Sequence, residues 1–140
     1  MKRFLILVLA TTLSACATTP TSISGAQSVP AERIFYKSPS QSDQVATTIF
    51  IRDSGLFGSA LDNHLAINDT IAATLRVGEK VVLTLPAGEY VFGIHTVELL
   101  SSQPVRTIDQ RLEAGKTYSY RISAATGGPI VQRTIIQAAR

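Results

Sequence analysis

The chain has no tryptophan, a single cysteine and only two histidines among its 140 residues. One cysteine excludes an intramolecular disulfide and any metal site built from cysteines alone. Charged residues are also few, at 16%, whereas apolar residues make up 45%, and intrinsic disorder goes with the opposite balance. The length fits one domain, or one domain with a tail. The composition therefore predicts a single folded domain without disulfides.

No apolar run in the sequence is long enough to cross a bilayer, which takes about 20 residues in a helix. The short apolar run 4–10 follows Lys2 and Arg3, and small residues up to Ala15 come before Cys16. This order of basic, apolar and small residues is typical of a secretory signal peptide. We expect a signal peptide over the first 15 residues, cut between Ala15 and Cys16. A plain secreted protein with Cys16 as an incidental thiol is the alternative.

The sequence Leu-Ser-Ala-Cys at positions 13–16 resembles the lipobox of bacterial lipoproteins. The resemblance implies that Cys16 receives a diacylglyceryl group and becomes the first residue of the mature protein. Several acyl chains would anchor the protein stably, because each buried CH₂ contributes about 0.8 kcal/mol. Ala17 stands where an aspartate would direct retention, so the resemblance also implies sorting to the outer membrane, usually to its periplasmic face.

The charge balance does not point to a nucleic-acid partner. The formal charge of +3 comes from 13 basic and 10 acidic residues, and loss of Lys2 and Arg3 leaves 11 basic residues against 10 acidic ones. No basic run of the kind that marks nucleic-acid binding is left. We therefore expect a membrane contact through a lipid anchor and no nucleic-acid contact.

Residues 16–31 hold the cysteine followed by small, polar, proline and glycine residues without apolar periodicity. Such a composition is typical of a flexible linker, and fifteen residues of this kind span on the order of 20 Å. We expect this linker to connect the membrane anchor to the domain and to let the domain move relative to the membrane. An ordered N-terminal strand is the alternative interpretation.

Residues 32–140 alternate between short runs rich in β-branched and aromatic residues and turn residues, which is typical of an all-β sandwich or barrel. Strands are predicted at 33–37, 45–52, 61–68, 71–75, 80–85, 90–97, 106–112, 117–123 and 130–137. Alternating apolar and polar residues within several strands indicate antiparallel sheets with one solvated face. We therefore predict a small antiparallel β-sandwich, similar in build to transthyretin or immunoglobulin domains.

The turns support a hairpin-rich fold. Asn68 and Asp69 predict a tight hairpin, because both residue types tolerate positive φ. Gly78, Gly88 and Gly115 each precede a charged residue in a similar turn sequence. We expect all three glycines in the left-handed conformation of a hairpin loop.

Three segments, 51–60, 65–69 and 85–90, combine a strand with a Gly-Ser loop, a strand with a tight turn, and a Pro-Ala-Gly-Glu-Tyr turn. Together they resemble the small bacterial outer-membrane lipoproteins of unknown function. The resemblance covers residues 45–96, and it implies a small β-sandwich on a lipid anchor. It brings no catalytic residue with it.

Residues suited to catalysis or metal binding are scarce. His64 and His95 are 31 positions apart and lack the H-x-x-x-H or H-x-H spacing of a metal-binding pair. Asp62 lies on the same predicted strand face as His64, but Ser59 does not stand in the G-x-S-x-G elbow of a hydrolase. We expect the histidines to be ordinary surface or core residues, and we expect no catalytic residue, metal or cofactor.

The loop that follows residue 52 carries an apolar pair, Leu56 and Phe57, between glycines. The pair either folds inward and plugs one end of the sandwich or forms an exposed tip that contacts a partner. An unpaired edge strand is a second candidate contact, because it can accept a strand from a partner.

These features predict a non-enzymatic outer-membrane lipoprotein that acts as a periplasmic binding or scaffolding module for a protein partner. No small-molecule substrate is predicted. Two other roles stay open: an accessory subunit of an envelope or secretion machine, and an inhibitor of a lytic enzyme. The transthyretin-like lipoproteins of type VI secretion are comparable in size and build. A hydrolase is the least favoured interpretation.

Overall fold

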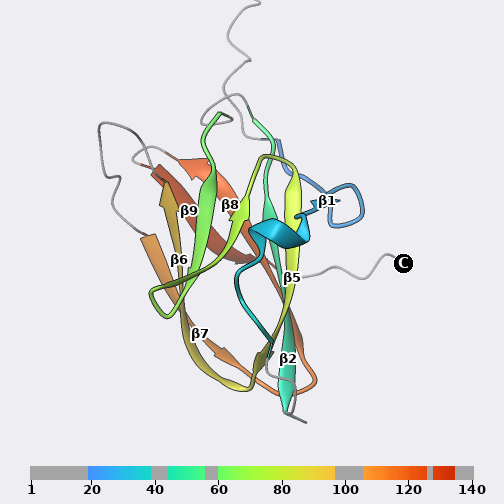
Figure 1. Cartoon of the computed structure of the whole chain (residues 1–140), viewed down its shortest axis with the longest axis vertical. Helices are drawn as coiled ribbons and strands as arrows, with labels where there is room; N and C mark the ends of the chain where they lie inside the picture. The colour runs from blue at the N-terminus through green and yellow to red at the C-terminus, as the bar shows by residue number, and fades with distance from the viewer. Residues whose placement is uncertain (1–18, 39–43, 56–59, 97–105, 126–127, 135–140) are drawn as a thin grey trace, which may run out of the picture.

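The structure is a computed structural model that describes residues 19–38, 44–55, 60–96, 106–125 and 128–134. Its regular elements in these ranges are strands and one short 3₁₀ helix (Figure 1). They are β1 Gln27–Ser28, η1 Ala31–Arg33, β2 Val45–Arg52, β3 Asn63–Ile67, β4 Thr70–Leu75, β5 Glu79–Pro86, β6 Gly88–Thr96, β7 Arg106–Leu112, β8 Thr117–Ala125 and β9 Gly128–Thr134. No helix in the described ranges is long and apolar enough to span a membrane.

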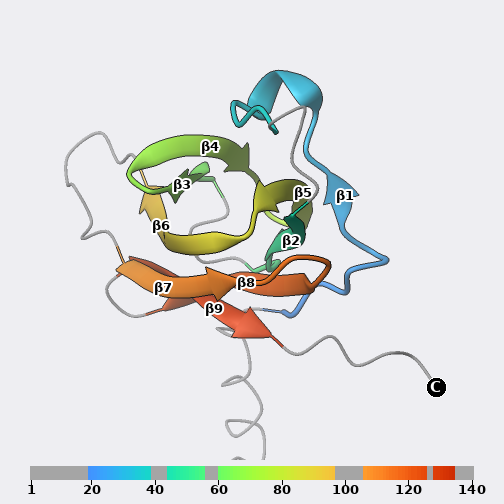
Figure 2. The same ribbon diagram turned by 90° about the horizontal axis from the view of Figure 1, so that it is seen from below.

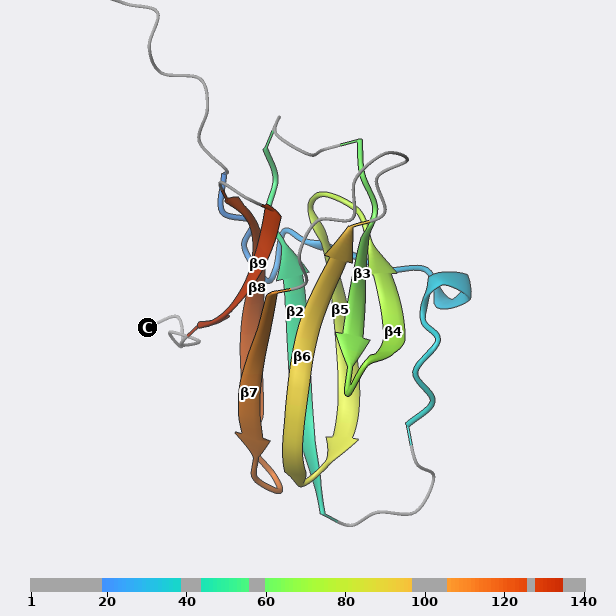
Figure 3. The ribbon, with the colours of Figure 1, turned by 90° about the vertical axis from the view of Figure 1, so that its left-hand side faces the viewer.

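The strands form two sheets that pack face to face, as Figure 3 shows. One sheet has the order β1-β5-β2-β8-β9 and the other the order β4-β3-β6-β7. Most neighbouring strands are antiparallel, but β2 runs parallel to β8 and β1 runs parallel to β5. The predicted all-β sandwich is confirmed, and the two parallel pairs depart from a purely antiparallel arrangement.

The sequence pattern located most of the strands. The predicted strands 45–52 and 106–112 coincide with β2 and β7. Six others differ by a few residues at their ends, where the pairing partner decides how far a ladder extends. The predicted strand 33–37 is wrong. Its start belongs to η1, where the N–H groups of Arg33 and Ile34 donate to carbonyls three residues back, so these groups are satisfied locally.

The turn glycines are only partly as expected. Asn68 and Asp69 form the predicted tight turn with φ of 48° and 64°, and Gly78 and Gly115 are left-handed at 73° and 72°. Gly88 is not left-handed. It is already the first residue of β6 and is paired with β7, so its backbone is extended.

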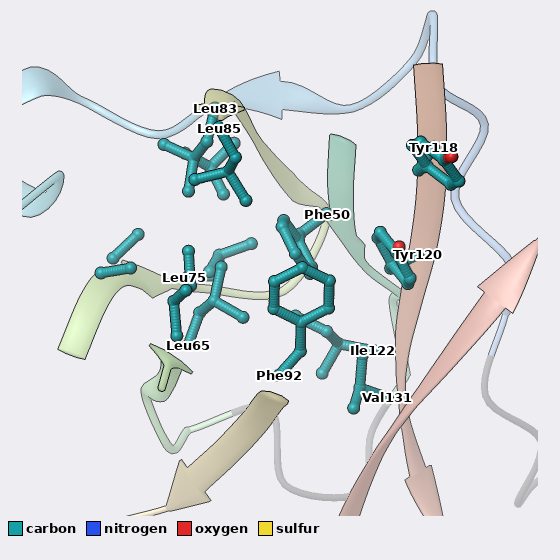
Figure 4. Close-up of a cluster of buried hydrophobic side chains, with 14 of the residues drawn as sticks. Phe50, Leu65, Leu75, Leu83, Leu85, Phe92, Tyr118, Tyr120, Ile122 and Val131 are labelled. Atoms are coloured by element: carbon teal, nitrogen blue, oxygen red, sulfur yellow. The ribbon is translucent and has the colours of Figure 1, made fainter. Parts of the chain in front are cut away.

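The core lies between the sheets and centres on three aromatic rings (Figure 4). Phe50 of β2 stacks on Tyr120 of β8 with ring centroids 4.8 Å apart, and both meet Phe92 of the opposite sheet edge-on at 5.0 Å. The aliphatic residues around the rings include Leu65, Leu75, Val81, Leu83, Leu85, Ile94, Leu112, Ile122 and Val131. Because the rings come from both sheets, their packing holds the two layers together.

In place of the flexible linker predicted for residues 16–31, the chain from Thr19 onward is held against the domain. We call residues 19–36 the N-terminal strap. Along β5, Gln27 N–H donates to the Gly78 carbonyl at 3.0 Å and Val29 N–H donates to the Lys80 carbonyl at 2.9 Å. Figure 2 shows β1 lying beside β5. The strap covers an edge that would otherwise present unpaired backbone groups.

The strap then crosses to the second sheet. Beyond η1, Ile34 pairs with Ala73, and the N–H groups of Phe35 and Tyr36 both donate to the Ala72 carbonyl, at 2.8 and 3.0 Å. These bonds lie along β4, the edge strand of the four-stranded sheet. The strap therefore joins the edges of both sheets on one side of the sandwich.

Candidate functional site

The strap begins at a buried polar cluster that follows the end of β2. Oδ1 of Asp53 accepts a hydrogen bond from Thr21 N–H at 3.1 Å and another from the Arg121 guanidinium, and Oδ2 accepts from Ser123 Oγ at 2.7 Å. Arg121 also donates to the Thr21 carbonyl at 3.0 Å. The parallel pairing of β2 and β8 brings the cationic group beside the carboxylate. Asp53 is 6% exposed, so these charge-assisted bonds are shielded from water.

Ser54 forms a second set of hydrogen bonds to the strap. The N–H of Thr19 donates to the Ser54 carbonyl at 2.6 Å, and the N–H of Ser54 donates to the Thr19 carbonyl at 3.0 Å. The hydroxyls of Thr21 and Ser54 lie 3.0 Å apart. Residues 19–21 are therefore fixed to the domain by backbone and side-chain bonds, only three positions after Cys16.

An ion pair fixes the middle of the strap. Both guanidinium Nη atoms of Arg33 contact the Glu79 carboxylate, at 2.5 and 2.9 Å, and the backbone N–H of Arg76 donates to it at 2.8 Å. Burial alone would raise the pKa of Glu79, but the hydrogen bonds and charge of Arg33 with the Arg76 N–H hold this pKa below its ordinary value. The pair ties the last residue of η1 to the first residue of β5.

Arg52, the last residue of β2, carries a buried guanidinium at the same end of the sandwich as Asp53. Its Nη1 donates to the carbonyls of Leu61 at 2.6 Å and Leu75 at 2.8 Å. Burial lowers the pKa of this guanidinium, although the nearby carboxylates oppose the shift. Arg52 therefore links the approach to β3 with the end of β4.

Most of the residues that the sequence singles out as contact or modification sites lie outside the described residues. These are Ala15, Cys16, Leu56 and Phe57. The described residues nearest to them are Thr19 and Gly55, and Thr19 is paired with Ser54. Thr19, the first described residue, therefore lies beside Ser54, next to the end of the described segment 44–55.

The two histidines, which their sequence spacing does not connect, are brought together by the fold. His64 of β3 lies directly opposite His95 of β6 in the antiparallel register. Nδ1 of His64 is 2.9 Å from the Thr74 hydroxyl of β4. In the part of the chain that the structure describes, no group of three or more His, Cys, Asp or Glu side chains is arranged to hold a metal ion.

An open apolar groove of about 440 Å³ lies beside the far end of the strap. Its lining includes Phe35, Tyr36, Ile67, Ile71 and Tyr90. Phe35 is 52% exposed. The groove is a candidate contact surface that the sequence analysis missed, because residues from the strap and from three strands form it together.

Comparison of the chain with protein-family models, with curated proteins and with solved structures found no match in any of the three.

Proposed function

We propose that the protein is an outer-membrane lipoprotein whose β-sandwich acts as a non-enzymatic binding or scaffolding module on the periplasmic side. The observation that carries this proposal is the single cysteine, Cys16, at the end of a basic, apolar and small-residue leader. A thiol at this position is the group that lipidation requires. The absence of a nucleophile elbow or a motif for phosphate binding favours binding over catalysis.

If Cys16 is lipidated, the bonds of the strap would hold the domain near the membrane. A linker that was free over residues 17–31 would let the domain move away from the membrane. Because Thr19 is bonded to Ser54, the free part of the linker would be much shorter. An anchored domain needs little free energy from each contact with its partner, because attachment to the same surface raises the local concentration of both. This argument favours a protein partner that resides in or near the same membrane.

The surface offers contact sites suited to such a partner. The groove beside Phe35 is apolar and open, and Val82 is 53% exposed on the outer face of β5. The apolar pair Leu56 and Phe57 stays a candidate contact as well. A contiguous exposed apolar surface marks a protein contact site, and among these candidates the groove beside Phe35 is the one formed by several residues together.

The type of β-sandwich is part of the same proposal. We propose that the sandwich is similar in build to the transthyretin-like and immunoglobulin-like domains, which have two packed sheets. The support is the pairing of a five-stranded with a four-stranded sheet around one core.

The test is the mass and the location of the full-length protein expressed in a Gram-negative host. The protein and a control variant, Ala17→Ser, are expected in the outer-membrane fraction, with an acylated Cys16 as the first residue. Cys16→Ser should lose both the lipid and the membrane association. An unmodified thiol in the membrane-extracted wild-type protein, or cleavage at another residue, would overturn the anchor. Cross-linking in intact cells then identifies the partner, and capture of no protein at all would count against the scaffolding role.

A further inference from the structure

His64 and His95 form one row across the four-stranded sheet together with Thr74. In the register, Thr74 of β4 is opposite His64 of β3, and His64 is opposite His95 of β6. Side chains on a strand alternate between faces. Leu65 and Ile94, the neighbours of the two histidines, point into the core, so both imidazoles lie on the outer face of the sheet.

The spacing across the strands suits a shared ion. Residues directly opposite in an antiparallel pair hold their Cβ atoms about 4.5–5.5 Å apart. A metal–imidazole bond is about 2.0–2.1 Å long, so two nitrogens on one ion lie about 3 Å apart. Two imidazoles that start from opposed Cβ atoms can converge to that separation by side-chain rotation alone, without moving the backbone.

Thr74 orients one of the two rings. The Thr74 Oγ1 atom lies 2.9 Å from Nδ1 of His64. When Nδ1–H donates to this hydroxyl, Nε2 carries the lone pair that a metal ion needs. A metal-binding histidine usually has its other ring nitrogen held by such a partner, which fixes both the tautomer and the ring orientation.

The surroundings are compatible with a bound cation. The next pair along the same face is Ala66 opposite Gly93, and both are buried although they face outward. On the other side, the carboxylate of Asp62 is 3.3 Å from Nε of Arg76, so these two charges offset each other.

We propose that His64 and His95 together bind one borderline divalent transition ion, with Cu²⁺ favoured over Zn²⁺, and that Thr74 positions His64 for this role. Imidazole is a preferred ligand of both ions, and Cu²⁺ binds nitrogen ligands more tightly than Zn²⁺ does. Two protein ligands leave the other coordination positions to water. The site is independent of the proposed lipid anchor.

The proposal is tested by titrating the full chain, purified in detergent without a histidine tag, with Cu²⁺. We expect one ion per chain and electron paramagnetic resonance couplings from two imidazole nitrogens. His64→Asn and His95→Asn should each weaken binding at least about tenfold and leave coupling to one imidazole. Thr74→Val should weaken binding by about tenfold, which is the lower end of the effect of such an orienting partner. Thr117→Val, an exposed threonine in the other sheet, serves as the matched control and should bind like the wild type.

Folding of each variant is checked by its urea midpoint without metal, and the wild-type protein provides a readout that needs no variant. Cu²⁺ or Zn²⁺ in excess should raise the wild-type urea midpoint, because an ion that binds only the folded state stabilises it. Unchanged Cu²⁺ affinity in both histidine variants would overturn the proposal. So would two independent ions per chain, or no shift of the wild-type midpoint with either ion.

Discussion

Replacing Asp53 by alanine should release the start of the N-terminal strap. The carboxylate accepts hydrogen bonds from the Thr21 amide, the Arg121 guanidinium and the Ser123 hydroxyl. Removing one partner of a buried ion pair costs about 3–5 kcal/mol. The Arg121 side chain is 24% exposed and regains some hydration, so we expect a loss of about 3 kcal/mol, the low end of that range.

The assay combines urea unfolding with amide hydrogen exchange. With a urea dependence of about 1.5 kcal/mol per M, a loss of about 3 kcal/mol corresponds to a fall of roughly 2 M in the urea midpoint. The amide of Thr21 should also exchange faster, because its acceptor is gone. Asp109→Ala is the matched control. Its carboxylate is exposed on β7, and such a surface change alters stability by about 0.5 kcal/mol or less.

A double-mutant cycle separates the ion pair from the other bonds of Asp53. Asp53→Ala combined with Arg121→Met should cost less than the sum of the two single changes, because both remove the same contact. The reasoning is refuted if Asp53→Ala and Asp109→Ala unfold at the same urea concentration. It is equally refuted if the Thr21 amide stays as protected as in the wild type.

Three further predictions concern other parts of the fold. The pKa of Glu79 is lower in the folded protein than its ordinary value of 4.5, so its stabilisation is present above pH 4.5 and is lost as the pH falls through the folded value. In urea unfolding between pH 7 and pH 3, Glu79→Gln should therefore be less stable than the wild type at neutral pH, and the difference should shrink in acid. Tyr120→Phe removes a buried hydroxyl without a hydrogen-bond partner among the described residues, and it should raise the free energy of unfolding by about 1 kcal/mol; a fall would show that the hydroxyl is bonded. Asp69→Val should lower the thermal midpoint, because a β-branched residue at φ of 64° costs about 1–2 kcal/mol, whereas Asp69→Gly should be tolerated; equal midpoints for the two variants would contradict the turn assignment.

The sequence pattern was sufficient where local chemistry determines the structure. Residues 45–52 are rich in β-branched side chains, and residues 106–112 place Ile108 and Leu112 on one face; these segments became β2 and β7. The Asn68-Asp69 turn followed from the same kind of local preference, since these residues tolerate positive φ. Gly88 shows the limit of this reasoning, because pairing with β7 overrides the turn preference of its sequence.

The strap could not be recognised in this way. Most of its bonds to the domain use backbone groups, which leave no mark on the amino-acid pattern. Its apolar contribution along β5 comes from Ala26 and Val29, which are 7% and 5% exposed. Two isolated apolar residues in a stretch of serine, threonine and proline do not form a periodic signal. Ala26 and Val29 are buried because the strap pairs with the edge strand β5, and the sequence alone does not reveal that pairing.

The histidine row and the Asp53 cluster depend on strand order, which local patterns do not specify. His64 and His95 become neighbours because β6 returns to pair with β3 after the chain has formed β4 and β5. Asp53 and Arg121 meet because β8 adds parallel to β2. Parallel and non-consecutive pairings join segments that are far apart in the chain, so both clusters required the three-dimensional fold.

The strap changes what a lipid anchor would do for this domain. Thr19 is three positions beyond Cys16. A chain of three residue steps reaches at most about 10 Å when fully extended, compared with the roughly 20 Å expected for a free fifteen-residue linker. Under the proposed lipidation, the end of the sandwich that carries Asp53 and Ser54 would be held close to the bilayer. The anchor would then set the orientation of the domain as well as its concentration. Because the Asp53 carboxylate holds the first residues of the strap, its loss would lengthen the tether without changing the lipid, and so would separate the effect of orientation from the effect of attachment.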